Sequence, residues 1–230
     1  MGNAGIKGTA IATAAAAWLV LAAGAWADAR IVGHPDVIDG DGLAFGPVSV
    51  RLHGIDAAEI GQRCALARGG TWGCDEAAAE RLAELVAGQR VECEPLDRDP
   101  YGRIVARCMA GGVDVGQALV AEGLAWAFRR YSDDYALAEE GARKIGAGVW
   151  QAETQPPWEY RETRWGRAAE ASPREGCPIK GNVNRVGERI YHTPWSPWYG
   201  RTVIDEGAGE RWFCDEAEAH AAGWRPARSR

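Results

Sequence analysis

Carboxylates and arginines gather in three short segments of this 230-residue chain. Residues 37–42 read Val-Ile-Asp-Gly-Asp-Gly, residues 50–59 read Val-Arg-Leu-His-Gly-Ile-Asp-Ala-Ala-Glu, and residues 99–103 read Asp-Pro-Tyr-Gly-Arg. Two aspartates at the end of a strand can bind a hard divalent cation through oxygen. An arginine fork matches two phosphate oxygens, and a further carboxylate can orient or deprotonate a water. Together these groups are the equipment for hydrolysis of a phosphodiester.

Each segment taken alone also has an ordinary structural explanation. Residues 39–42 are typical of a hairpin turn, Arg51 is typical of a solvated strand residue, and residues 101–103 are typical of a turn beside a charge. The occurrence of all three segments in this order and at these intervals favours the catalytic interpretation.

The three segments resemble the thermonuclease family, typified by staphylococcal nuclease. The pattern of that family is D-G-D-T, then R-L-x-G-I/V-D-T/A-P-E, then D-x-Y-G-R, and the resemblance covers roughly residues 30 to 150. It implies an α+β fold in which helices pack on a five-stranded OB-fold barrel. It also implies a calcium-dependent endonuclease that cleaves DNA and RNA and leaves 3′-phosphate ends.

The resemblance assigns roles by motif position. The implied Ca²⁺ ligands are Asp41, Asp56 and the backbone carbonyl of Ala57. The implied catalytic residues are Arg51 and Arg103, which would bind the phosphate, and Glu59, which would position or activate the water. The implied neighbours of the site are Tyr101, beside the nucleotide, and Asp39, behind the metal ligands.

Two residues depart from the family pattern. Gly42 stands where the family has threonine, and Ala58 stands where it has proline. The second change loosens a constrained turn beside Glu59. A disulfide between Cys64 and Cys74, directly after this turn, would restore rigidity there. Separately, Tyr131 is expected to pack in the core or to stack on a base, as aromatic side chains do in single-strand channels.

Apolar patterning and turn residues predict the elements that position these segments. The expected strands are 30–38, 48–55, 90–95, 103–109 and 124–128, and the expected helices are 75–87, 115–122 and 133–145. Asp75 and Ser132 are placed as the N-caps of the first and last helices. This order favours a small closed or nearly closed barrel with helices packed on it.

Residues 1–29 are typical of an export signal. Lys7 is the only charge before Asp28, and small-x-small cleavage patterns end the apolar stretch. The alternative is a retained anchor, because the uncharged stretch is close to the ~18–20 residues that span a bilayer. We expect a periplasmic or secreted monomer without stable membrane insertion after cleavage.

All six cysteines follow the signal segment, where an oxidising compartment favours disulfides. A zinc site is the competing interpretation, but the sequence has no C-x-x-C pair. Proximity along the chain predicts the pairs Cys64–Cys74, Cys93–Cys108 and Cys177–Cys214.

The C-terminal part is expected to be a separate, small unit. Residues 151–176 are polar and are expected to form a linker that is at best partly helical, and residues 177–230 form a disulfide-stapled accessory domain. Residues 190–194 and 210–226 are similar to the zinc domain of the Ada DNA-repair protein. The metal cysteines of that domain are missing, so neither metal binding nor methyl transfer is implied.

Composition leaves two further functions open. A hydrophobic content of 47% excludes a disordered chain, and a net charge of -6 argues against a passive nucleic-acid coat. The alternatives to a nuclease are a non-catalytic OB-fold protein that binds nucleic acid and an envelope interaction protein whose tail is the working part.

Overall fold

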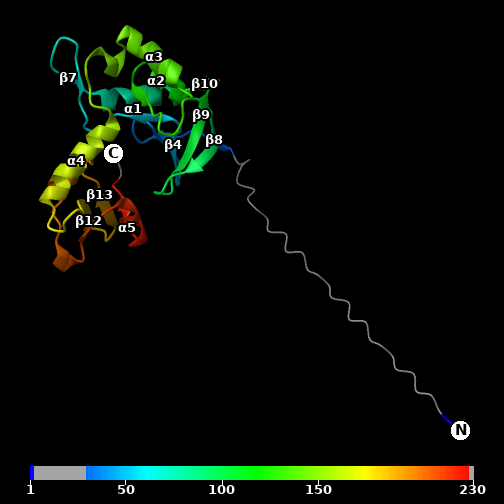
Figure 1. Ribbon diagram of the computed structural model, residues 1–230, viewed down its shortest axis with the longest axis vertical. Coiled ribbons are helices and arrows are strands. Elements are labelled where there is room, and N and C mark those ends of the chain that lie inside the picture. The colour runs from blue at the N-terminus through cyan, green and yellow to red at the C-terminus, as the bar shows by residue number, and fades with distance from the viewer. Residues whose placement is uncertain (3–29, 228–230) are drawn as a thin grey trace.

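The computed structural model describes residues 1–2 and 30–227, and within these it has two units joined by a long helix, α4 (Pro157–Ala171) (Figure 1). We call residues 30–156 the barrel unit and residues 172–227 the C-terminal unit. The export signal expected at residues 1–29 lies outside the described residues except for its first two. Within the described residues, no helix is long and apolar enough to cross a bilayer.

The barrel unit is built on one curled sheet with the strand order β1-β8-β9-β4-β3-β2 and with β10 beside β9. Its strands are β1 (Ile31–Gly33), β2 (Asp36–Val37), β3 (Gly42–Phe45), β4 (Val48–Leu52), β8 (Val91–Arg98), β9 (Ile104–Ala110) and β10 (Val113–Asp114). Two short pairs complete the unit: β5 (Ile55–Ala57) with β11 (Ala125–Ala127), and β6 (Cys64–Ala65) with β7 (Thr71–Trp72). The curled sheet with helices packed on it confirms the predicted α+β fold of OB type.

Two expected strands are each divided by a residue that cannot continue the ladder. The segment 30–38 forms β1, which pairs with β8, and β2, which pairs with β3, because Pro35 between them has no N–H to donate. The segment 48–55 ends as β4 at Leu52, and the chain turns through Gly54 at a φ of +72° into β5. This turn places Arg51 and Asp56 on different strands.

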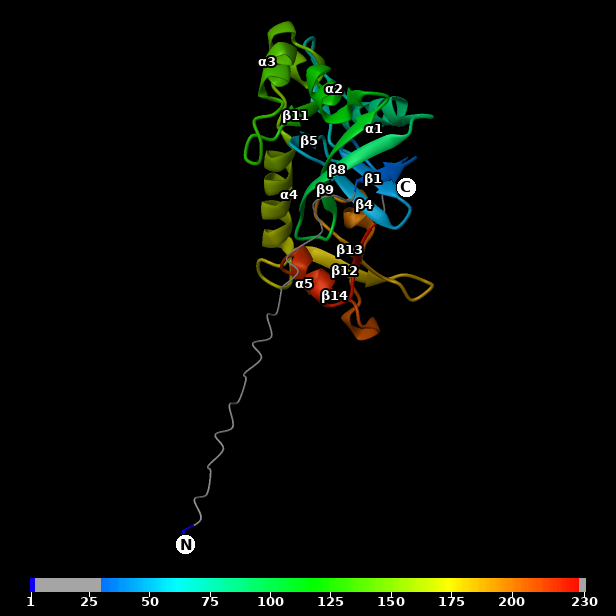
Figure 2. The ribbon, with the colours of Figure 1, turned by 90° about the vertical axis from the view of Figure 1, so that its right-hand side faces the viewer.

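Helices cover one side of the curled sheet (Figures 1 and 2). They are α1 (Cys74–Val86), α2 (Val115–Ala121), α3 (Ala136–Ile145) and the short 3₁₀ helix η1 (Gly148–Gln151). α1 buries Ala78, Leu82 and Val86, which lie on one face at a spacing of four residues. These side chains join a core formed mainly by strand residues.

Both predicted N-caps are wrong, by two residues for α1 and by three for α3. Gly73 is the N-cap of α1, and Asp75 lies in the first turn, where its carboxylate accepts a hydrogen bond from Gly61 N at 2.6 Å. α3 begins at Ala136, and Ser132 Oγ accepts instead from Asp134 N in the preceding turn. The start of α3 is set by Tyr135, which is buried and donates from its hydroxyl to Asp114.

The segment 151–176, expected to be a linker that is at best partly helical, contains the 15-residue helix α4 at residues 157–171. Pro157 lies in the first turn, where a missing N–H costs nothing. Trp158, one residue later, packs against the buried cluster of the barrel unit that contains Trp126 and Val149. α4 therefore begins as part of the barrel unit.

The C-terminal unit is a small sheet stapled by a disulfide. Its strands are β12 (Ile179–Val183), β13 (Arg189–His192), β14 (Arg211–Phe213) and β15 (Arg225–Pro226), in the order β14-β12-β13-β15. Its helices are α5 (Glu216–Ala221), η2 (Tyr199–Arg201) and η3 (Glu206–Ala208). All three predicted pairings, Cys64–Cys74, Cys93–Cys108 and Cys177–Cys214, are confirmed.

Candidate active site

Arg51 joins two of the predicted metal ligands. It lies in β4, opposite Gly42 of β3, and Asp41 directly precedes β3. Arg51 Nη2 donates to Asp56 Oδ1 at 2.6 Å and lies 3.2 Å from Asp41 Oδ2. Both aspartates are almost completely buried. Because one guanidinium nitrogen reaches both carboxylates, their oxygens converge on a single point.

The backbone beside these carboxylates is fixed by hydrogen bonds. Ala57 N donates to Asp41 Oδ2 at 3.1 Å, and Asp41 N donates to Asp39 Oδ1 at 3.2 Å. Burial, together with the nearby charge of Asp41, raises the pKa of Asp39 to about 6. A Cβ atom at Gly42 would lie 2.6 Å from Asp39 Oδ1, so the Asp39 carboxylate fills the space that a side chain at position 42 would need.

A third arginine, Arg161 of α4, was missed by the sequence interpretation. Its Nη2 donates to Asp56 Oδ2 at 2.7 Å, and its Nη1 donates to Glu59 Oε1 at 2.5 Å. Burial raises the pKa of Glu59 to about 7, and the positive charge of Arg161 opposes that rise. Arg161 therefore clamps the predicted metal ligand and the predicted base together.

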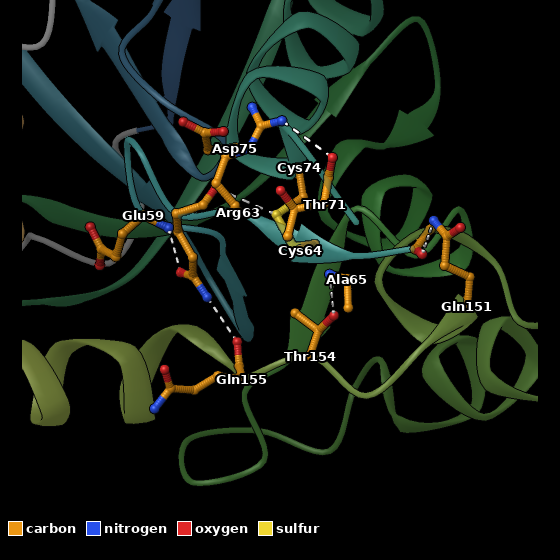
Figure 3. Close-up of a disulfide and its surroundings, with 12 residues drawn as sticks. Glu59, Arg63, Cys64, Ala65, Thr71, Cys74, Asp75, Gln151, Thr154 and Gln155 are labelled. Carbon is orange, nitrogen blue, oxygen red and sulfur yellow. Dashed lines mark hydrogen bonds between the residues drawn. A yellow bond between two sulfur atoms is a disulfide. The ribbon is translucent and has the colours of Figure 1, made fainter. Parts of the chain in front are cut away.

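The loop between Glu59 and α1 supports this clamp (Figure 3). Gln62, which is 2% exposed, accepts from Glu59 N at 3.0 Å and donates to the Gln155 carbonyl at 2.8 Å. The disulfide Cys64–Cys74 closes the same loop. One buried amide thus holds both the backbone of Glu59 and the segment that leads into α4.

Residues 99–103, the third of the sequence segments, form a separate edge of the site. Arg103 Nε donates to Asp99 Oδ2 at 2.6 Å, and the Arg103 guanidinium lies 5.6 Å from the ring centroid of Tyr101. Tyr101 is 37% exposed and Tyr131 is 69% exposed, so Tyr131 is not a core residue. The ring of Tyr131 rests on Phe128 with centroids 5.0 Å apart.

A single cleft of about 2020 Å³ brings these side chains together. The predicted residues on its walls are Asp39, Asp41, Arg51, Ala57, Glu59, Tyr101, Arg103 and Tyr131. Asp56 is not on the wall, because at 1% exposure it lies beneath Arg51 and Arg161. Across the part of the chain that the structure describes, no three His, Cys, Asp or Glu side chains form a ready metal cluster.

Comparison with known proteins finds relatives for both units. Residues 49–152 match the family described as staphylococcal nuclease homologue, and residues 163–226 match a family described as ArfC. The second match does not support the expected likeness to the Ada zinc domain. The second match begins within α4, at residue 163, whereas the first match ends at residue 152, before α4.

Three curated relatives match between 54% and 65% of the chain. The succinoglycan biosynthesis protein ExoI of Rhizobium meliloti is 38% identical over 130 residues, which are 54% of this chain and 67% of that protein. An uncharacterized endonuclease of Escherichia coli is 34% identical over 136 residues, 56% of this chain and 82% of that protein. A micrococcal nuclease of Shigella flexneri is 32% identical over 170 residues, 65% of this chain and 90% of that protein. The chain belongs to the family of staphylococcal nuclease homologues.

Proposed function

We propose that this nuclease is an exported, calcium-dependent enzyme that hydrolyses DNA and RNA and leaves 3′-phosphate ends. The observation that carries the proposal is the convergence of Asp41 and Asp56 on one nitrogen of Arg51, with Glu59 tied to Asp56 through Arg161. Carboxylates, an arginine fork and a candidate base thus meet at one wall of a cleft.

The donor set suits Ca²⁺. Asp41, Asp56 and the carbonyl of Ala57 are all hard oxygen donors, and Ca²⁺ accepts such ligands together with waters. When bound, the cation would neutralise negative charge that builds on the phosphate. The carboxylate oxygens already approach one cationic nitrogen at 2.6 and 3.2 Å, which supports their capacity to hold a cation.

The side chains have distinct proposed roles in the reaction. Arg51 and Arg103 bind phosphate oxygens from two edges of the cleft and stabilise charge in the transition state. Asp99 holds the Arg103 guanidinium in place through its 2.6 Å ion pair. Glu59 accepts the proton of the attacking water, which becomes the new oxygen on phosphorus as the 5′ oxygen leaves.

Incubation of the purified protein with single-stranded DNA, duplex DNA and RNA tests the proposal. We expect cleavage in Ca²⁺, none after chelation, and 3′-phosphate ends on the products. Binding without cleavage would support the non-catalytic alternative. The absence of both binding and cleavage would support an envelope interaction protein. Cleavage that survives chelation would contradict calcium dependence.

Arg161 should weaken Ca²⁺ binding, because it occupies Asp56, a proposed Ca²⁺ ligand, as a competing cation. We expect Arg161→Met to raise the Ca²⁺ affinity about tenfold, a typical coupling between competing ligands. Calorimetric titration with Ca²⁺ measures this directly. Arg164→Met is the matched control, since Arg164 lies on the same helix and donates its hydrogen bonds to the hydroxyl of Tyr160. Unchanged or weaker Ca²⁺ binding in Arg161→Met would contradict the competition.

Three disulfides are compatible with export, because such bonds persist in oxidising compartments. We also propose that the protein is located in the periplasm or the medium and that it is a monomer. A signal sequence at residues 1–29 would be tested by N-terminal sequencing of the protein recovered outside the cytoplasm.

The disulfide Cys64–Cys74 should matter more for activity than for folding, because its loop holds the backbone of Glu59 through Gln62. We expect the double variant Cys64→Ala, Cys74→Ala to lose about tenfold in kcat, as expected for a misplaced catalytic group, with little loss of helical circular dichroism. The matched control removes the disulfide Cys93–Cys108, which joins β8 to β9 and not the loop that holds Glu59. Equal losses of activity and helix content would contradict the prediction.

A further inference from the structure

The cleft has a second wall, formed by α4 and the C-terminal unit, that the proposed chemistry does not use. Trp158, Arg161, Glu162 and Trp165 all line the cleft, and their spacing of three and four residues places them on one face of α4. Figures 1 and 2 show α4 running from the barrel unit to the C-terminal unit along one side of the molecule. This face of α4 therefore looks across the cleft.

Two aromatic pairs lie along this face of α4, one with the barrel unit and one with the C-terminal unit. Trp158 stacks on Phe128 with centroids 5.4 Å apart and planes at 16°. Trp165 lies against Trp195 of the C-terminal unit with centroids 6.2 Å apart and planes at 37°. We call these four side chains, with Trp198, the aromatic wall; all five line the cleft.

Along α4, the residue that contacts the carboxylates of the site lies between the two tryptophans of the aromatic pairs. Trp158 and Trp165 are seven residues apart on α4, which is about 10 Å along the helix axis. Arg161 lies between them and reaches Asp56 and Glu59. A chain whose phosphate lies at these carboxylates would therefore meet one aromatic pair on each side.

The ligand that fits is a polyanion with flat, apolar groups on both sides of a phosphate. Aromatic side chains stack on base faces, and only unpaired bases expose both faces. A net charge of -6 gives little general attraction for a polyanion, so contacts other than charge must help to hold it. An apolar peptide would leave Arg51 and Arg103 without anionic partners from the ligand.

We propose that the aromatic wall binds the bases of a single-stranded nucleic acid on both sides of the phosphate held by Arg51 and Arg103. This inference rests on the proposed nuclease function and gives the C-terminal unit a task in it: Trp195 and Trp198 complete the substrate site from the opposite unit. The enzyme is then a better single-strand than duplex nuclease.

Trp195→Ala tests the wall. We expect its dissociation constant for a fluorescent oligothymidylate, measured by anisotropy in chelator, to rise about tenfold, within the range for loss of one base stack. KM for single-stranded DNA in Ca²⁺ should rise equally with kcat unchanged, and Trp195→Phe should restore most of the loss. Trp212→Ala is the control, because Trp212 lies on another hollow of the C-terminal unit, beside Lys180 and Thr202.

The outcomes separate this inference from the proposed function. Wild-type affinity in Trp195→Ala, an equal loss in Trp212→Ala, or an equal loss of duplex binding would overturn the aromatic wall. If Trp195→Ala does not fold, Trp198→Ala gives the same measurement. A wild-type protein that binds oligothymidylate but cleaves nothing in Ca²⁺ would overturn the proposed function and leave the wall supported.

Discussion

Arg51→Lys is expected to lower kcat by about two to three orders of magnitude, the usual cost of losing a preorganised charge-stabilising donor. Lysine keeps the positive charge but lacks the fork. In the native site one nitrogen, Nη2, lies between Asp41 and Asp56, which leaves the other N–H groups of the guanidinium for a phosphate. The single nitrogen of the lysine ammonium group cannot donate to both aspartates and also present a further pair of N–H groups to the phosphate.

Single-turnover cleavage of an oligonucleotide at saturating Ca²⁺ measures this loss. Arg81→Lys is the matched control, because Arg81 also makes a forked ion pair, to Glu122, but on the exposed surface of α1. We expect that control to keep its full rate. Near-normal turnover in Arg51→Lys would remove the fork from the mechanism, whereas a rate loss shared with Arg81→Lys would point to general destabilisation.

The sequence could predict the parts of the site that are encoded locally. Asp41, Arg51 and Asp56 lie at strand ends and turns, and a motif of fixed spacing determines such positions once the strands pair. The disulfides were predictable for the same reason, since Cys93 and Cys108 lie opposite each other in one hairpin. The curled sheet follows from the same short-range order of strands.

Arg161 could not be found in this way, because its partners Asp56 and Glu59 lie 105 and 102 residues away in the sequence. Its helix was obscured by a polar composition with few apolar residues. Two signals were nevertheless present. Pro157 is favoured in a first helical turn, and Trp158 and Trp165 share a helical face with Arg161.

The starts of α1 and α3 show that a local signal in the sequence can also give a wrong prediction. Asp75 and Ser132 are both common N-cap types, yet α1 begins after Gly73 and α3 after Tyr135. Asp75 is used instead to hold Gly61 in the loop that follows Glu59. A capping residue identifies a helix start only when no other backbone N–H competes for its side chain, as Gly61 N does for Asp75 and Asp134 N does for Ser132.

Glu59→Gln is expected to lower kcat by about a hundredfold to ten-thousandfold, the range for loss of a general base. Glutamine keeps the size of the side chain, and its amide oxygen can still accept the hydrogen bond from Arg161. It cannot accept a proton from water at neutral pH. Because Glu59 is not among the proposed Ca²⁺ ligands, calorimetry should show nearly unchanged Ca²⁺ binding.

Glu162→Gln is the matched control for this prediction, since Glu162 is an exposed carboxylate on the α4 side of the same cleft. Loss of one negative charge from the cleft would affect both variants, whereas loss of the base affects only Glu59→Gln. A full rate in Glu59→Gln would assign proton transfer to another group. A parallel fall of Ca²⁺ affinity and rate would instead make Glu59 a metal ligand.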